Sequence, residues 1–288
     1  MKFLVSNDDG VYAPGLEALA GIASQLGEAR VVAPMTEQSG VGHAITFLTP
    51  LIAKPIRRRG GANHDPSFVA TGVEFRATGV EFRATGVEFR ATGVDGSPAD
   101  CVKLALGELM KDDPPDLVLS GINSGLNSGI NVLYSGTVAA AIEGAFFGVT
   151  SIAVSLEHDD EPDYAAAAER VLPIIRGIVA ARPRPGSLFN INVPTAATRP
   201  ETAAESRTVV VPMGLAQYGR SYERRVDPQG NPYYWALWTA PEDPPPEAAD
   251  IVQLRRGHVT VTPLHFDLTD RRQLEAMADW NLDGSPPA

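Results

Sequence analysis

The sequence predicts an α/β fold: a doubly wound, mostly parallel, Rossmann-like sheet with a C-terminal β-hairpin extension. Short apolar runs alternate with segments of helical periodicity along residues 1–200, as in a parallel sheet with crossover helices. Several of those runs end in polar, glycine-bearing segments, which is typical of the carboxyl ends of parallel strands. After Pro200 the pattern changes to alternating, aromatic-rich segments around a turn, which indicates a hairpin.

The composition describes an ordinary globular protein, long enough for one large domain with an extension or for two small domains. The chain has 288 residues, of which 44% are hydrophobic and 20% are charged. We expect a Rossmann-like core over residues 1–200 and an extension over residues 201–288 that returns one strand to the core. The single cysteine, Cys101, excludes an intramolecular disulfide and a metal cage of thiolates, and we interpret it as a small core residue.

Charge and hydropathy argue against two classes of partner. The net charge of −11 disfavours a protein that coats duplex nucleic acid, where Lys and Arg must neutralise phosphates. No apolar run reaches the length of a membrane span, and polar residues begin at Ser6, too early for a signal peptide. We therefore expect a cytoplasmic protein that binds neither a membrane nor duplex nucleic acid. A small phosphorylated substrate remains compatible with this charge.

The first predicted unit is a strand, a helix and a second strand. An apolar run ends abruptly in Asn7-Asp8-Asp9-Gly10, which indicates either a strand tip that binds a ligand or an acidic turn. Apolar positions at helical spacing predict a helix up to Leu26, and residues 29–34 predict the next strand. The loop after that strand contains Ser39. Because such a unit is parallel, we expect the acidic tip and the Ser39 loop to lie at the same edge of the sheet.

Residues 44–90 are less regular. Residues 44–69 predict a short strand pair and an exposed loop, with Arg57-Arg58-Arg59 in a solvated turn. The segment ATGVEFR at 70–76 then recurs unchanged at 77–83 and 84–90, before a partial fourth copy. A period of seven would turn the apolar face of a strand over with each copy, and a helix would carry one glycine per copy. We therefore expect residues 70–90 to be an insertion that loops out of an otherwise complete sheet.

The remaining pattern continues the α/β alternation and then changes. Helices are predicted after Pro98, over 138–147 and over 164–181, and strands over 117–119, 151–155 and 188–194. In the extension, strands at 208–211 and 233–238 are expected to flank a turn at 227–230 as a hairpin arm, and residues 259–264 form the last strand. An exposed aromatic hairpin more often packs against a partner subunit than against water, so we expect a homo-oligomer that uses this arm.

Polar side chains follow three of the predicted strands. They are Asp8 and Asp9, Ser39, and Asn123, and all of them carry oxygen donors. Carboxylate, hydroxyl and amide oxygens suit magnesium, manganese or calcium and suit zinc or copper poorly. Two negative charges facing a dication leave coordination positions for water and a substrate oxygen. Individually, Ser39 could cap a turn and Asn123 could close one.

A second candidate site lies where Ser135-Gly136-Thr137 begins a predicted helix. Unpaired backbone N–H groups and the helix dipole favour an anion there, although Ser135 or Thr137 could simply cap the helix. Metal ligands and an anion site together indicate phosphoryl chemistry. No Gly-Lys-Ser/Thr follows the glycines, so this is not a P-loop, and the spacing of Gly10 and Gly15 excludes a dinucleotide fingerprint.

Several motifs along the whole chain resemble the stationary-phase survival protein SurE family. The residues that carry the resemblance are Asn7-Asp8-Asp9-Gly10, Ala13-Pro14-Gly15, Glu37-Gln38-Ser39-Gly40, Pro98-Ala99-Asp100-Cys101, Ser120-Gly121-Ile122-Asn123-Ser124-Gly125, Tyr134-Ser135-Gly136-Thr137 and Val261-Thr262-Pro263-Leu264. The resemblance implies a phosphatase that depends on a divalent metal ion, Mg²⁺ or Mn²⁺, and acts on nucleoside 5′- and 3′-monophosphates and, in some members, on short polyphosphate. It also implies dimers or tetramers formed by exchange of the C-terminal hairpin.

The resemblance assigns roles to particular residues. It implies metal ligation by Asp8, Asp9, Ser39 and Asn123, and it places Asn127, Ser135, Gly136 and Thr137 around the phosphate. The repeat block at 70–90 is a departure from the family pattern. Arg271, near the C-terminus, stands where some members have histidine, whereas Asp267 fits the pattern.

Asp8 and Asp9 are the expected catalytic residues. They would hold the ion that polarises a phosphoryl oxygen, while the helix N-terminus at Ser135 receives developing charge. The sequence leaves open whether Asp8 attacks phosphorus or acts only as ligand and base. A non-catalytic nucleotide-binding regulatory module is the main alternative, and a glycosyltransferase that binds a nucleotide sugar is the third.

Overall fold

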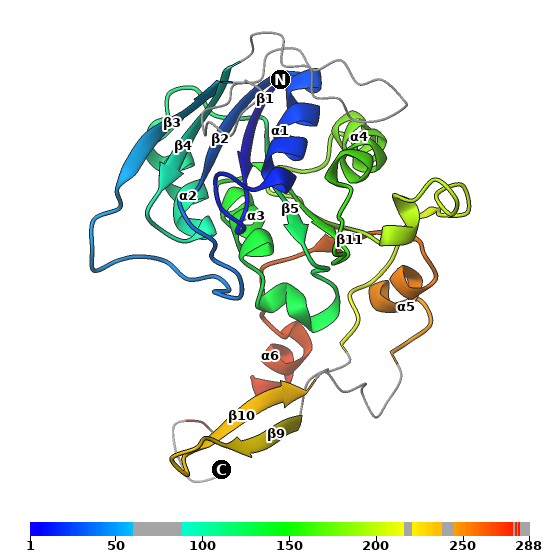
Figure 1. Ribbon diagram of the computed structural model, residues 1–288. Helices are drawn as coiled ribbons and strands as arrows, with labels where there is room; N and C mark the ends of the chain where they lie inside the picture. Colours follow the sequence, from blue (N-terminus) through cyan, green and yellow to red (C-terminus); the bar gives the residue numbers. More distant parts are fainter. Residues whose placement is uncertain (60–87, 216–220, 238–244, 279, 281, 283–288) are drawn as a thin grey trace.

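A nine-stranded, mostly parallel sheet forms the centre of the protein (Figure 1). The computed structural model describes residues 1–59, 88–215, 221–237, 245–278, 280 and 282. The strands lie in the order β3-β4-β2-β1-β5-β6-β7-β11-β8. Their bounds are β1 Lys2–Ser6, β2 Glu28–Pro34, β3 Ala53–Arg59, β4 Glu88–Val94, β5 Leu117–Ser124, β6 Thr150–Leu156, β7 Leu188–Val193, β8 Thr208–Val210 and β11 Val259–Leu264. Among the described strands of this sheet, the pairs β3–β4 and β7–β11 are antiparallel and the others are parallel.

Helices cover both faces of this sheet, so the predicted doubly wound fold is confirmed. Helices α1 (Pro14–Leu26) and α4 (Tyr164–Ala181) pack on one face, and α2 (Pro98–Leu104) and α3 (Gly136–Phe146) pack on the other. A π-helical turn, Ala105–Leu109, continues α2. Shorter helices are Gly129–Leu133 and Thr195–Ala197, both 3₁₀, with α5 Asp250–Arg255 and α6 Arg271–Met277 in the C-terminal part.

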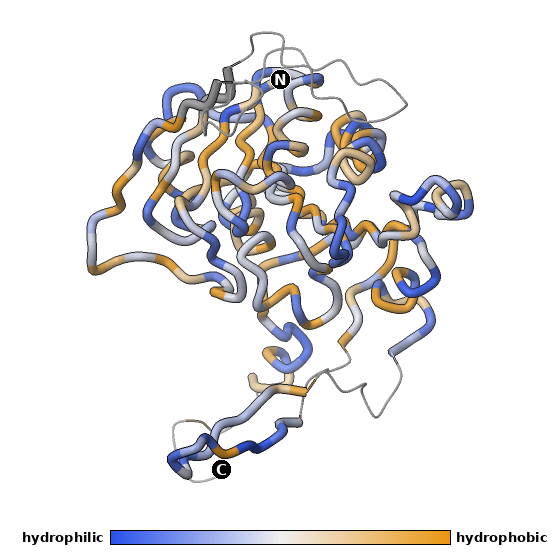
Figure 2. Tube along the Cα trace, viewed as in Figure 1, coloured by the Kyte–Doolittle hydropathy of each residue, from blue (hydrophilic) through white to orange (hydrophobic). Residues whose placement is uncertain are grey.

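The central strands are buried on both sides, as their apolar runs predict. Phe3, Leu4 and Val5 of β1 have no exposed surface, and orange, hydrophobic stretches run through the centre of the sheet (Figure 2). Helix α1 lies so close to β5 that a Cβ atom on Gly15 would come within 2.0 Å of the Ile122 carbonyl oxygen. A glycine is therefore required at this point of the packing.

The strand order reverses beside β1, and this position determines where a ligand can bind. From β1 the chain first builds outward through β2 and β4 and then returns to place β5 on the other side of β1. In open α/β sheets, ligands bind outside the carboxyl ends of strands at such a reversal. The predicted metal ligands lie at this reversal: Asp8 and Asp9 follow β1, Ser39 follows β2, and Asn123 is near the end of β5.

The basic triplet and the end of the repeat block lie in the sheet, contrary to the sequence prediction. Arg57–Arg59 belong to β3 rather than to a turn, and they pair with Glu88–Arg90 of β4. Those three residues are the last of the repeat block, so residues 88–90 do not loop out. Residues 70–87 lie outside the described part of the chain. The error arose because pairing between β3 and β4 is a nonlocal contact that a local charge pattern does not reveal.

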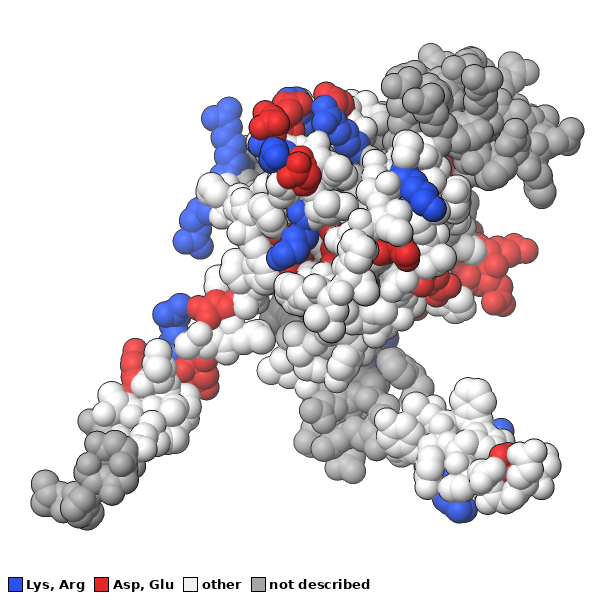
Figure 3. Space-filling view, turned by 90° about the vertical axis from the view of Figure 1, so that its left-hand side faces the viewer, with Lys and Arg blue, Asp and Glu red and all other residues white. Residues whose placement is uncertain are grey.

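The hairpin arm exists, but its first strand was assigned wrongly. Strand β9 (Ser221–Val226) pairs with β10 (Pro232–Leu237), whereas Thr208–Val210 forms β8 and pairs with β11 in the main sheet. The Asp227 carboxylate accepts hydrogen bonds from the backbone N–H groups of Gln229 and Asn231, which closes the turn. In a space-filling view, the parts that project below the body carry both positive and negative side chains among many uncharged ones (Figure 3).

Candidate active site

The turn after β1 holds two adjacent carboxylates in fixed positions. Asn7 donates a hydrogen bond from Nδ2 to the Gly10 carbonyl oxygen at 3.0 Å, and the Val11 N–H donates to the Pro34 oxygen at 2.7 Å. Gly10 has φ +100°, a conformation that side-chain-bearing residues rarely adopt. This turn directs Asp8 and Asp9 to different neighbours.

Asp8 joins β1 to the N-terminus of α3 and to the loop after β2. It is 3% exposed, and it accepts a hydrogen bond from the Thr137 hydroxyl. Its backbone oxygen accepts one from the Gln38 N–H at 2.7 Å. A Cβ atom on Gly136 would lie 2.9 Å from the Asp8 Cβ atom, so a glycine lets the helix begin against this carboxylate.

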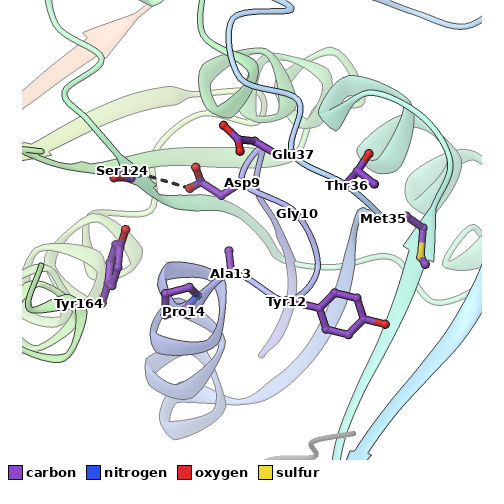
Figure 4. Close-up of a pocket in the computed structure, with 10 residues that line it drawn as sticks. All are labelled: Asp9, Gly10, Tyr12, Ala13, Pro14, Met35, Thr36, Glu37, Ser124 and Tyr164. Carbon is purple, nitrogen blue, oxygen red and sulfur yellow. Dashed lines mark hydrogen bonds between the residues drawn. The ribbon is translucent and has the colours of Figure 1, made fainter. Parts of the chain in front are cut away.

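Asp9 lies on the other side, at the rim of a pocket (Figure 4). It accepts a hydrogen bond from the Ser124 N–H at 3.3 Å. Burial, and then the neighbouring charge of Asp8, raise the pKa of Asp9 to about 6. Burial likewise raises the pKa of Asp8 above its usual range. A cation bound between these two neighbouring, largely buried carboxylates would stabilise their ionised forms.

The other two candidate ligands also reach this edge of the sheet. Asn123 donates from Nδ2 to the Gly125 oxygen at 2.6 Å, which turns its amide oxygen the other way. Ser39 is exposed and donates its hydroxyl proton to Glu37 at 2.8 Å, so its oxygen keeps lone pairs for another partner. The Gln38–Asp8 hydrogen bond holds this loop at the tip of β1.

The donor set fits a hard divalent cation. Within the described residues, no three His, Cys, Asp or Glu side chains gather at one place, so a cage of the zinc type is not formed there. Asp8, Asp9, Asn123 and Ser39 supply only oxygen, as Mg²⁺ and Mn²⁺ prefer. Burial is the main cause that raises the pKa of both aspartates, and a bound cation would favour their ionised forms.

The N-terminus of α3 has a side-chain cap, and it also presents backbone N–H groups to which an anion could bind. The Ser135 hydroxyl accepts a hydrogen bond from the Val138 N–H at 3.1 Å, as an N-cap does. The Thr137 hydroxyl is committed to Asp8, a partner that sequence reasoning missed. An anion here would therefore meet backbone N–H groups, and not the Thr137 hydroxyl.

Asn127 is held by a network of buried polar side chains that sequence reasoning also missed. Its backbone N–H donates to Asn192 Oδ1 at 2.8 Å, and its carbonyl oxygen accepts from Asn190 Nδ2 at 2.7 Å. Its side-chain amide donates to the Ser155 hydroxyl at 2.9 Å. The sequence feature that could have predicted this network is the pair Asn190 and Asn192. They occupy alternate positions of an apolar strand, which places both side-chain amides on one face.

Two buried carboxylates tie peripheral segments to the site loops. Glu143 of α3, 2% exposed, lies 2.7 Å from His43 Nε2 and 3.4 Å from Lys103 Nζ, and His43 belongs to the loop that carries Ser39. Asp250 of α5 accepts hydrogen bonds from the Gly129 and Gly214 N–H groups at 2.8 and 2.9 Å.

Near the C-terminus, Arg271 forms an ion pair with Asp267 at 2.5 Å.

Comparison with known proteins gives one consistent result. Residues 3–219 match the family model described as Survival protein SurE. The chain is 57% identical over 282 residues to 5′-nucleotidase SurE of Rhodopirellula baltica, covering 98% of this chain and 99% of that protein. It is 40% identical to 5′-nucleotidase SurE 1 of Thermus thermophilus, with full coverage of both. The crystal structure of the SurE protein from Aquifex aeolicus matches with a TM-score of 0.74 at 32% identity, over 96% of this chain and 98% of that one.

Proposed function

The chain belongs to the Survival protein SurE family, and we propose that it is a 5′-nucleotidase that requires a divalent metal ion. The reaction adds water to the phosphorus of a nucleoside 5′-monophosphate, breaks the P–O ester bond and releases the nucleoside and phosphate. The observation that supports this most strongly is the contact of Asp8 with both Thr137 and Gly136, which unites a carboxylate pair with a helix N-terminus.

In this proposal, Asp8, Asp9, Ser39 and Asn123 hold one Mg²⁺ or Mn²⁺ ion, which supplies Lewis-acid polarisation of a phosphoryl oxygen when bound. The backbone N–H groups at Gly136 and Thr137 receive phosphate oxygens and the charge that develops on them. Ser135 holds these groups in position through the helix cap. Asn127, which the asparagine network holds, would contact the phosphate beside them. Thr137 fixes the orientation of the Asp8 carboxylate.

Phosphate release distinguishes this enzyme from a nucleotide-binding regulatory module. We expect release from 5′-AMP with Mg²⁺ or Mn²⁺ and none with a chelator. Asp8→Asn and Asp9→Asn should abolish release with the fold intact, whereas Asp112→Asn, which removes an exposed carboxylate elsewhere, should not. Nucleotide binding without release in any metal would contradict the proposal. Assays with 3′-AMP and tripolyphosphate determine whether 3′-nucleotidase and polyphosphatase activities accompany it.

We also propose that the chain self-associates as a dimer or tetramer through β9 and β10. Tyr222, Tyr234 and Trp235 of this hairpin are more than half exposed, which is costly for aromatic side chains in a monomer. Sedimentation of wild type should give an oligomer, and Trp235→Glu should shift it toward monomer. Gln229→Glu adds the same charge at the hairpin turn and should leave the mass unchanged; a monomeric wild type would contradict the proposal.

For location we propose the cytoplasm, on the single cysteine and the soluble character of the sequence. Within the described ranges, none of the helices combines the length and apolar character needed to cross a bilayer.

A further inference from the structure

The Asp250 carboxylate joins the base of the hairpin arm (β9 and β10) to the loop between β5 and α3. We propose that Asp250 is a positioning residue of the phosphate site, and that through it the C-terminal extension fixes the loop that holds phosphate. This role rests on the proposed nucleotidase function. It adds a residue that lies outside the predicted metal and phosphate ligands.

Asp250 has no exposed surface, and both of its carboxylate oxygens accept hydrogen bonds from backbone N–H groups. Oδ2 accepts from Gly129 at 2.8 Å, and Oδ1 accepts from Gly214 at 2.9 Å. Oδ1 also accepts from the Ile251 N–H at 2.8 Å. Hydrogen bonds to an ionised acceptor are stronger than those between neutral groups. One buried side chain therefore holds two separate segments of backbone against each other.

One of these segments is the base of the arm. After β8 the chain passes through Pro212 and Gly214 before it forms the arm, and α5 begins at Asp250 after the arm. The Asp250 N–H donates to the Pro212 oxygen at 3.0 Å, so the outgoing and returning chains are joined here. A Cβ atom on Gly129 would lie 3.0 Å from the Gly214 carbonyl oxygen. The loop after β5 is therefore packed directly against the base of the arm.

The other segment lies between the residues that are expected to surround the phosphate. Asn127 precedes Gly129 closely, and the 3₁₀ helix Gly129–Leu133 leads from Gly129 toward Ser135, which caps α3. Gly125 and Gly129 have φ +119° and +57°, so the loop uses backbone conformations that glycine adopts freely. Such a loop keeps one shape only if other parts of the protein hold it. Asp250 supplies that support at Gly129.

Loss of this support should weaken phosphate binding without removing any group that contacts phosphate. The Asn127 amide and the N–H groups at the start of α3 would adopt several arrangements, and phosphate binding would have to order them again. Asp8, Asp9 and Ser39 belong to other loops, so binding of the metal ion should change little. Phosphate affinity and metal affinity can therefore be measured as separate properties of the same variant.

The test measures competitive inhibition of 5′-AMP hydrolysis by inorganic phosphate. Asp250→Asn replaces one carboxylate oxygen by an NH₂ group, which cannot accept the hydrogen bond from Gly129 or Gly214. We expect the inhibition constant to rise by about fivefold or more, while the Mn²⁺ concentration for half-maximal activity changes by less than about twofold. Gly129→Ala, which forces the loop away from the Gly214 oxygen, should raise the inhibition constant in the same direction.

A matched control removes a carboxylate clamp at another part of the same sheet edge. Glu157, directly after β6, accepts hydrogen bonds from the N–H and hydroxyl groups of Thr195. Glu157→Ala should lower the temperature of thermal unfolding and leave the inhibition constant of phosphate unchanged. A purely structural role for Asp250 predicts the same result for Asp250→Asn.

The outcomes separate the role of Asp250 from the proposed function. If wild type releases phosphate from no nucleotide, the nucleotidase proposal fails, and the role that rests on it fails too. If wild type is active but Asp250→Asn and Gly129→Ala keep the wild-type inhibition constant, or if Glu157→Ala raises it equally, Asp250 does not position the phosphate loop. Thermal unfolding identifies misfolded variants, and Gly129→Ala, which leaves Asp250 in place, keeps the test valid if Asp250→Asn does not fold.

Discussion

Thr137, the second residue of α3, donates a hydrogen bond from its hydroxyl to the carboxylate of Asp8, the second residue after β1. This contact joins the sheet edge to the helix N-terminus, and both side chains are almost fully buried. The carboxylate is therefore oriented before any ligand arrives. In a preorganised site, such orientation is not lost to side-chain motion during the reaction.

Replacing Thr137 by Val tests this orientation. Valine keeps the shape of the side chain and removes only the donor, so we expect kcat/KM for phosphate release to fall by about 10- to 100-fold. Thr137→Ser retains the hydroxyl and should recover most of the activity. The assay is initial-rate kinetics on 5′-AMP at saturating Mn²⁺. A serine variant as slow as the valine variant would show that the hydroxyl is not the relevant group.

The raised pKa of Asp9 gives a pH dependence of stability for the metal-free protein. Because the folded-state pKa is about 6 and the unfolded value is about 3.8, the folded state binds more protons between these values. Stability therefore falls as pH rises through this window. The shift of about 2 units corresponds to about 3 kcal/mol, which we reduce to about 1–2 kcal/mol because Asp9 is half-buried and partly screened by solvent.

Asp9→Asn should remove this cost. In the presence of a chelator, we expect the variant to be more stable than wild type by about 1–2 kcal/mol at pH 7.5 and equally stable near pH 4. Urea unfolding at both pH values measures the difference, and Asp112→Asn serves as the control for loss of an exposed carboxylate. A stability difference of the same size at both pH values would contradict the raised pKa of Asp9.

Glu143 anchors the loop that carries Ser39, through His43. Glu143→Gln keeps the shape but weakens the contacts with His43 and Lys103, so we expect a loss of about 1–3 kcal/mol of stability. The Mn²⁺ concentration for half-maximal activity should rise severalfold, with kcat at saturating metal almost unchanged. Glu108→Gln breaks an exposed pair with Lys111 and should change neither quantity. An unchanged Mn²⁺ requirement in Glu143→Gln would show that the His43–Glu143 contact does not hold the Ser39 loop in position for metal binding.

The repeat block offers a deletion that leaves the sheet sequence intact. Because the copies are identical, removal of residues 70–83 keeps one full copy, including the Glu88–Arg90 segment of β4. If the other copies are an insertion, we expect the shortened chain to fold and to release phosphate at the wild-type rate. Removal of 95–108, a deletion of equal length, takes out the buried helix α2, which has no second copy, and should prevent folding. Loss of folding in the first deletion would show that the extra copies are structural.

Much of the fold could be predicted because the local pattern and the tertiary structure agree. The abrupt change from Val5 to Asn7-Asp8 correctly predicted the buried strand β1. The same change predicts that the tip of this strand binds a ligand, and the same reasoning made Asn123 a candidate. Pairing between distant segments could not be predicted in this way. Thr208–Val210 has the pattern of a hairpin strand, but its partner is Val259–Val261 in the main sheet.

The candidate site shows the same division between local and distant information. The predicted metal ligands and the start of α3 follow from residue type and position, whereas the role of Thr137 depends on a contact between elements far apart in the chain. The pocket beside Asp9 also depends on distant contacts. Tyr12 and Tyr164, which line it, are far apart in the sequence and are brought together only by the folded sheet. Neither tyrosine has a local pattern that distinguishes it from an ordinary surface or helix residue.

The central claim is that Asp8 and Asp9 hold one divalent ion at the edge of the sheet, and titration calorimetry with Mn²⁺ tests it most directly. We expect wild type to bind one Mn²⁺ ion per chain at this site, Asp8→Asn and Asp9→Asn to bind at least about tenfold more weakly, and Asp112→Asn to bind as wild type does. Mn²⁺ binding by Asp8→Asn and Asp9→Asn with the wild-type affinity and stoichiometry would contradict the account.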